Sequence, residues 1–301
     1  MNFRSNLVIL HQSIEDFNAS LSAQGQQLAA HLEQILSNKK IEVPMLPDVA
    51  SRVLALSNDP DSDAAQLANL IQGDQALAGH VMQIANSAAY TPNSSLVSLQ
   101  QAIARLGMSL ITEISIAASL NAKLFKAPGF EGRISEIWFH ALCTAMWGKE
   151  VARVSKQNVE ASFLCGLLHS IGRPVILQEL SEYACEHDIS ISQDEALLLE
   201  QYFHIKFGEV IVQKWGMPII VLESVQYYED YNDAPKNKEE AMVIHGAAML
   251  AKVMDVEDAD ARLDEILSDE VFANLNLYDD EIEKLKQQAE KVKASVEAMR
   301  A

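Results

Sequence analysis

Hydrophobic residues recur at helical spacing through most of this sequence. Between residues 12 and 37 they form one stripe, made of Ile14, Phe17, Leu21, Leu28, Leu32 and Ile35. The same spacing predicts later helices over residues 134–156, 159–170, 174–186, 193–204, 206–215, 219–230 and 238–254. No segment shows the two-residue alternation of a half-buried strand. The pattern therefore predicts an all-α fold.

Local signals mark several helix boundaries in the first third of the chain. The turn NDPDSD and Asp74 each offer an N-cap, and Ser98 with Gln101 three residues later resembles a capping box. Gly107 is expected to end the helix that Ser98 begins. Asn86 and Ser87 either contact a ligand or, as we favour, cap a helix and tie down the loop that follows.

The last 47 residues, from Asp255, combine an acidic composition with a heptad-like seam. They carry 14 acids and 6 bases, a net charge of −8. Apolar residues step by three and four along the seam Ile282, Leu285, Ala289, Val292, Val296 and Met299. A helix docked on its own domain is the favoured interpretation of this seam, and a homodimer interface is the alternative.

The overall composition narrows the class of protein. The chain of 301 residues is 49% hydrophobic and 6% aromatic, and it has only 12 glycines and 8 prolines, which is typical of a helical globular protein. Its formal net charge of −19 would repel a nucleic-acid backbone and favours partners with positive charge. We therefore expect no nucleic-acid partner.

The cysteines and the apolar runs bear on localisation. Cys143, Cys165 and Cys185 have no paired spacing that suggests zinc or a disulfide framework, so a reducing cytoplasm is the expected compartment. The apolar run from Leu7 to Leu10 is too short for a signal-peptide core. Residues 241–254 are interrupted by His245 and are too short to span a bilayer. We expect no membrane association.

Four histidines lie at apolar or boundary positions on separate predicted helices, and they are the candidates for a shared pocket. They are His140, His169, His204 and His245. The segment GLLHSIGRPVIL places Ser170 directly after His169, and a neutral hydroxyl cannot neutralise a divalent cation as a carboxylate would. Glu200 shares a helix face with His204, a spacing that suits either metal ligation or a hydrogen-bonded pair.

Several blocks of the sequence resemble the HD-related output domain, usually written HDOD. They are the run from LPDVASRVLALSNDPDSD to QIANSAAY, then SLQQAIARLG, WFHALCTA and ASFLCGLLHSIG, and finally the pattern of His204, Gly208, Trp215-Gly216 and Pro218. The similarity extends from about Val43 to about Glu229. We therefore predict three parts, an N-terminal helical extension over 1–40, an HDOD domain over 41–235 and an acidic helical extension over 236–301.

The resemblance implies an all-helical fold related to the HD metal-dependent phosphohydrolases, and a role in bacterial signalling, usually without catalysis. It matches His140 and His169 to two metal ligands of the catalytic relatives. Ser170 stands where those relatives have aspartate, and no residue matches their last aspartate. Tyr227-Tyr228-Glu229 occupies the region where many HDOD relatives carry a histidine pair. The resemblance thus implies that His140 and His169 are vestigial metal ligands.

Two functions follow as hypotheses. The first is a non-catalytic output module, without a catalytic residue or a cofactor, that binds a signalling protein or a small ligand through a pocket of His140, His169, Ser170, His204 and His245. The second is a metal-dependent phosphohydrolase, in which these histidines hold a residual divalent metal ion and Glu200 or Glu229 replaces the lost aspartate. These candidate ligands carry little negative charge and suit a divalent cation poorly, which favours the first hypothesis.

Overall fold

The computed structural model describes residues 14–38, 41, 45–57, 59–92, 95–120, 124–254 and 259–300. These residues form α-helices and short 3-10 segments, and none of them lies in a strand, so the predicted all-α class is confirmed. No helix among them is long and apolar enough to cross a membrane. The chain divides into two compact units, and the division falls within helices α9 and α14.

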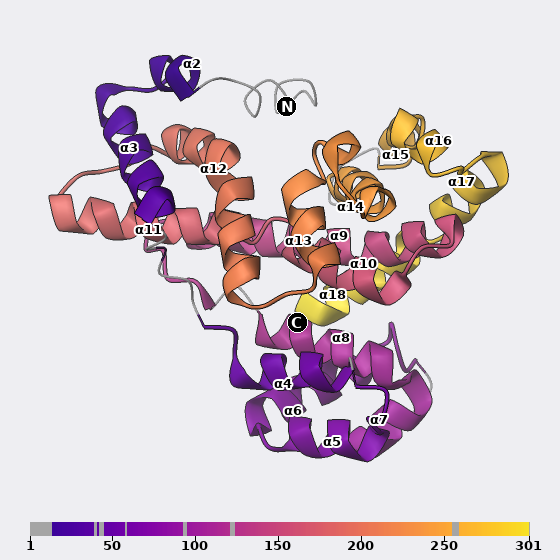
Figure 1. Ribbon diagram of the computed structural model, residues 1–301. Coiled ribbons are helices and arrows are strands. Elements are labelled where there is room, and N and C mark those ends of the chain that lie inside the picture. The colour runs from indigo at the N-terminus through magenta and orange to yellow at the C-terminus, as the bar shows by residue number, and fades with distance from the viewer. Residues whose placement is uncertain are drawn as a thin grey trace. The chain divides into compact units, whose positions relative to one another are not determined.

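The first unit comprises Met1–Pro44, Ala122–Trp138 and Leu168–Ala241. Helices α11 and α12 pack against each other (Figure 1), and α13 and α3 pack on α12. Its helices are α2 (Ile14–Ala19), α3 (Ala23–Asn38), the first turns of α9 (Glu131–Ser155), α11 (Gly172–His187), α12 (Gln193–Lys214), α13 (Ile219–Tyr227) and the 3-10 helix η2 (Tyr231–Asp233).

The second unit comprises Met45–Asn121, Phe139–Leu167 and Met242–Ala301. Helix α8 is its central element, since α4, α6 and α7 all pack on it and its residues 111–118 are buried. Beside the rest of α9 and all but the first turn of α14 (Lys238–Ala251), its helices are α4 (Asp48–Ser57), α5 (Ala64–Gln72), α6 (Gln75–Ala85), α7 (Leu99–Leu106), α8 (Met108–Ser119), α10 (Val159–Leu168), α15 (Ala259–Leu267), α16 (Glu270–Asn274), α17 (Asp279–Lys286) and α18 (Ala289–Arg300).

The helix caps predicted from local signals are confirmed. Asp63 forms a capping box with Gln66, and Asp74 accepts a hydrogen bond from the Leu77 amide at 3.0 Å. The Ser98 hydroxyl accepts a hydrogen bond from the Gln101 amide at 3.2 Å. Gly107 ends α7 with a φ of 89°, in the left-handed region that favours glycine.

Two predicted helix boundaries are wrong. The first predicted helix is interrupted between α2 and α3, where the Ser22 hydroxyl donates a hydrogen bond of 2.6 Å to Glu195 of α12. This contact spans 173 residues, so nothing in the local sequence signals it. In contrast, α12 is continuous from Gln193 to Lys214 where two helices were predicted, and this segment contains no proline that would end a helix.

The C-terminal seam is buried within its own unit. Leu285, Val292, Val296 and Met299 are all less than 5% exposed, and α18 contacts α8. The seam is divided between α17 and α18, because the helical conformation is interrupted at Gln287 and Gln288. These contacts agree with a helix docked on its own domain.

Candidate functional site

The structure places three of the five predicted pocket residues in the first unit. His169, Ser170 and His204 are each 3% exposed or less. His140 and His245 belong to the second unit, where both side chains are half-buried and the His140 Nε2 atom lies 3.2 Å from the Ala248 carbonyl oxygen. The candidate site is therefore built on His169 and His204 and on the residues that they contact.

Tyr228, at the end of α13, brings these two histidines together. The His169 ring meets the Tyr228 ring edge to face, with centroids 5.0 Å apart and planes at 84°. The Tyr228 hydroxyl lies 3.0 Å from the His204 Nε2 atom and donates a hydrogen bond of 2.8 Å to Glu229. Tyr228 is thus the residue that both histidines share.

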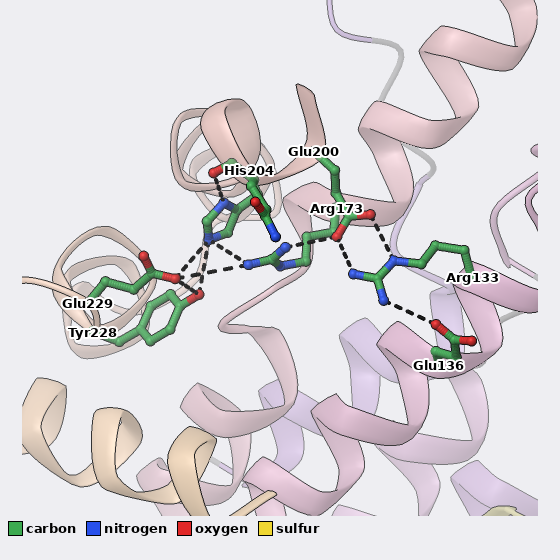
Figure 2. A network of polar contacts seen from close by, with 8 residues as sticks. Arg133, Glu136, Arg173, Glu200, His204, Tyr228 and Glu229 are labelled. Atoms are coloured by element: carbon green, nitrogen blue, oxygen red, sulfur yellow. Dashed lines mark hydrogen bonds and ion pairs between the residues drawn. The ribbon is translucent and has the colours of Figure 1, made fainter. Parts of the chain in front are cut away.

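Arg173, in the first turn of α11, extends this cluster toward α12. Its Nη1 atom donates a hydrogen bond of 2.8 Å to Glu200, and its Nη2 atom lies 3.2 Å from the His204 Nε2 atom. The same Nη2 atom lies 4.0 Å from a carboxylate oxygen of Glu229. Arg173 therefore faces two carboxylates and one imidazole at once (Figure 2).

A second arginine, Arg133 of α9, binds the same carboxylate from the other side. Its Nε atom donates to one Glu200 oxygen at 3.0 Å and its Nη2 atom donates to the other at 2.7 Å, which is the bidentate geometry of a strong ion pair. Its Nη1 atom donates to Glu136 at 3.1 Å. Glu200 is 0% exposed, so the two guanidinium groups provide the positive charge that a buried carboxylate needs.

The close approach of α11 to α12 is what allows Arg173 to reach these partners. Gly172 stands so near α12 that a Cβ atom at this position would lie 2.0 Å from the His204 carbonyl oxygen and 2.6 Å from the Gly208 amide nitrogen. Only glycine can occupy a position where two helix backbones meet this closely. The pair Gly172-Arg173 therefore sets both the helix contact and the ion pairs beside it.

The protonation properties of the cluster follow from its burial and its ion pairs. Burial alone raises the pKa of Glu200, but hydrogen bonds from Arg133 and the charge of Arg173 outweigh this effect and lower the pKa below its usual value. Burial also opposes the charge on Arg173, yet its acidic neighbours Tyr228, Glu200 and Glu229 raise its pKa. Burial raises the pKa of Tyr228 well above 10. Two guanidinium groups thus lie paired with the two carboxylates Glu200 and Glu229 in a buried network.

The lowered pKa of Glu229 predicts how the stability of the folded protein depends on pH. Hydrogen bonding and charge from His204, together with Arg173, outweigh burial and lower the pKa of Glu229 from 4.5 to about 2. A carboxylate with a depressed pKa stabilises the folded state above its unfolded pKa and loses this contribution as the pH falls. We expect the free energy of unfolding to decrease between about pH 4.5 and pH 2, measured by urea unfolding. In Glu229→Gln this decrease should be smaller, and an equal decrease in both proteins would contradict the assignment.

The polar groups of the first unit do not fit a divalent metal ion. The Nε2 atom of His204 is surrounded by the Tyr228 hydroxyl, Arg173 and, at 3.4 Å, a Glu229 oxygen. Both carboxylates that could replace the missing aspartate are paired with guanidinium groups, and Ser170 offers only a neutral hydroxyl. Within the described part of the chain, no three His, Cys, Asp or Glu side chains gather as a metal site would require.

Sequence reasoning identified part of this cluster and missed its centre. It singled out His169, Ser170, His204, Glu200 and Glu229, and it placed Glu200 and His204 on one helix face. The structure shows that these two side chains share Arg173. Arg133 and Arg173 were missed, although Arg173 stands as a charged residue inside the apolar run GLLHSIGRPVIL. A charge in such a run is a signal of a buried ion pair.

Comparison with known proteins identifies the class of protein. Residues 43–231 match the HDOD domain, which is more than half of the chain, and the chain therefore belongs to the HDOD domain family. A curated relative, an uncharacterised protein of Treponema pallidum (strain Nichols), is 21% identical over 228 residues. The match covers 73% of this chain but only 43% of that relative, so the chain spans less than half of the relative's length.

Solved structures share the fold at low sequence identity. An HDOD domain protein of unknown function from Geobacter sulfurreducens has a TM-score of 0.69 and 21% identity, and the match covers 91% of this chain and 98% of that chain. A candidate phosphohydrolase from Shewanella amazonensis SB2B has a TM-score of 0.66 and 22% identity, over 90% and 98% of the two chains. A candidate signal transduction protein from Marinobacter aquaeolei VT8 has a TM-score of 0.63 and 18% identity, over 94% and 69%. At these identities the likeness shows the fold alone.

Proposed function

We propose that this HDOD protein is a non-catalytic signal-transduction module that acts by binding another signalling protein or a small ligand. The observation that carries the proposal is the position of Arg173. Its guanidinium group lies between Glu200, Glu229 and His204, the side chains that a rebuilt metal site would need. A permanent positive charge at this place repels a divalent cation and uses the hydrogen-bonding capacity of its ligands.

The charge balance of the network favours a protein partner over a nucleotide. Arg133 and Arg173 are both paired with carboxylates of the protein, so neither guanidinium group is free to bind a phosphate group. The formal charge of −19 over the whole chain instead favours a partner with a positive surface. No disulfide joins Cys143, Cys165 or Cys185 in the described part of the chain, and this supports the cytoplasm as the compartment.

Elemental analysis combined with an activity assay tests this proposal. Untagged protein prepared without chelator should contain only trace amounts of iron, manganese and zinc, at the same level in the wild type and in His169→Ala. Neither protein should hydrolyse bis(p-nitrophenyl) phosphate when Mn²⁺ or Mg²⁺ is added. A content of about one metal ion per chain that is lost in His169→Ala, with turnover that is lost as well, would establish the phosphohydrolase instead.

A matched variant distinguishes a site blocked by Arg173 from a protein that lacks activity for other reasons. In Arg173→Gln the carboxylates of Glu200 and Glu229 lose this cation, and the affinity for Mn²⁺ should rise above that of the wild type. Isothermal titration with Mn²⁺ measures this difference, provided that circular dichroism shows the variant to be folded. Equal and measurable Mn²⁺ affinity in both proteins would mean that Arg173 does not oppose a metal ion.

A further inference from the structure

A single turn in the second unit carries three hydroxyl groups on one side. Between α6 and α7 the amides of Tyr90 and Thr91 both donate to the Ser87 carbonyl oxygen, at 3.1 and 2.8 Å. This bonding forms one helical turn from Ser87 to Thr91. Residues three and four apart on such a turn point to the same side, so Ser87, Tyr90 and Thr91 share one face. We refer to these three residues as the hydroxyl face.

The hydroxyl oxygen atoms of this face are shielded from solvent, and their hydrogen bonds are incomplete. The oxygen atoms of Ser87 and Thr91 are shielded from solvent and have no hydrogen-bond partner among the described residues. Thr91 as a whole is only 4% exposed. Buried hydroxyl groups in folded proteins nearly always have a partner, which is either the protein, an ordered water molecule or a ligand.

The turn that carries the hydroxyl face is held in place from behind. The side-chain Nδ2 atom of Asn86 donates to the carbonyl oxygens of Met82 and Leu96, at 3.1 and 3.0 Å. The Leu96 backbone amide donates to the side-chain Oδ1 atom of Asn86 at 2.7 Å. The predicted role of Asn86 in tying down the loop is thereby confirmed. These bonds fix the loop through the Asn86 side chain and involve neither the Ser87 nor the Thr91 hydroxyl group.

The groups around the hydroxyl face define the chemistry that it can accept. Burial raises the pKa of Tyr90 to about 12, so its phenol keeps its proton at neutral pH and can donate. Ser295 of α18 and Glu113 of α8 are its polar neighbours, and both are buried. Glu113 forms an ion pair with Lys149, so its charge is compensated. No uncompensated charge is available to bind an ion. The hydroxyl groups can both donate hydrogen bonds to a neutral ligand and accept them from it.

We propose that the hydroxyl face of Ser87, Tyr90 and Thr91 binds a small uncharged hydrogen-bonding ligand, either ordered water or a short polyol. The ligand completes the hydrogen bonds of Ser87 and Thr91. This site lies in the second unit and does not depend on the function proposed for the arginine network. It assigns to Ser87 the ligand-binding alternative that the sequence left open.

The sign of one stability change tests the proposal. Thr91→Val has nearly the same shape and replaces the hydroxyl group by a methyl group. If a ligand is bound there, the variant loses a hydrogen bond and its thermal midpoint should fall by about 2–4 °C. If the hydroxyl is truly without a partner, its removal relieves an unsatisfied polar group, and an unchanged or higher midpoint would overturn the proposal.

A matched control and a second variant test whether a lower midpoint in Thr91→Val reports a lost ligand. Thr144→Val, in the same unit, removes a buried hydroxyl that donates to the His140 carbonyl oxygen at 2.8 Å, and it calibrates the cost of losing one satisfied hydrogen bond. Ser87→Ala should lower the midpoint as Thr91→Val does. The double variant should lose less than the sum of the two if both hydroxyl groups bind the same ligand, and fully additive losses would contradict a shared ligand.

Titration with glycerol identifies the source of the ligand. A saturable rise of the midpoint in the wild type, absent from Thr91→Val, indicates a polyol site. If glycerol acts equally on both proteins while Thr91→Val still has a lower midpoint, the ligand is ordered water. Both results support the proposed chemistry, and the absence of any loss in Thr91→Val overturns it under either source.

Discussion

Replacing Arg173 by methionine is expected to lower the free energy of unfolding by about 3–5 kcal/mol, because it breaks a buried charge network by removing one partner. Glu200 is 0% exposed and would keep only Arg133, while Glu229 and His204 would lose their shared cation. Methionine fills a similar volume, so the loss reports mainly the uncompensated charge. Urea unfolding followed by circular dichroism at pH 7 measures the change.

An exposed arginine provides the matched control. Arg52 pairs with Asp48 at 3.6 Å with side chains 63% and 82% exposed, and Arg52→Met should change the stability by less than about 0.5 kcal/mol. The double variant Arg173→Met with Glu200→Gln should be less destabilised than the sum of its parts, since the two side chains are in direct contact. An Arg173→Met protein as stable as Arg52→Met would show that the network contributes little to folding.

Replacing Gly172 by alanine should be similarly disruptive, through packing and not through charge. The added Cβ would lie 2.0 Å from the His204 carbonyl oxygen and 2.6 Å from the Gly208 amide nitrogen, and both atoms belong to the backbone of α12. A helix backbone cannot turn aside as a side chain can, so α11 and α12 must separate. We expect a loss of about 3 kcal/mol, at the upper end for overpacking, with a lower urea midpoint.

Gly79 is the control for the same substitution where space is free. It lies in the interior of α6, and no atom stands within 4 Å of a Cβ added there. Gly79→Ala should therefore raise the stability by about 0.5–1 kcal/mol, the usual gain in helix propensity. If Gly172→Ala were neutral as well, the close approach of α11 and α12 would not be required by the fold.

The sequence predicted those features of the fold that depend on neighbouring residues. Asp63, Asp74 and Ser98 each cap a helix by accepting a hydrogen bond from the amide three residues further on, so the pattern of residue types was sufficient. The break after α2 depends on Glu195, which is 173 residues from Ser22. A contact at such a separation leaves no local trace, and for this reason the predicted helix ran through the break.

The residues of the candidate site also divide into those that the sequence predicts and those that it does not. His169 and His204 could be found because they interrupt apolar helix faces, and Ser170 because the family resemblance sets an expectation for that position. The partners of Arg133 and Arg173 could not be found. Glu200 is 67 and 27 residues away from them, and an arginine's choice of carboxylate is decided only when the helices pack. The two arginines at the centre of the network therefore could not be assigned to it from the sequence, although the two histidines could.

The cation at the centre of this cluster is the side chain of Arg173 and not a bound ion, so the first unit gains its stability without binding a metal. A bound metal stabilises a fold by mass action, so its contribution rises and falls with the free metal concentration. The guanidinium group of Arg173 is joined to the chain and is present as soon as the chain is synthesised. The stability that the arginine network contributes is therefore the same in a metal-starved cell as in a metal-replete one.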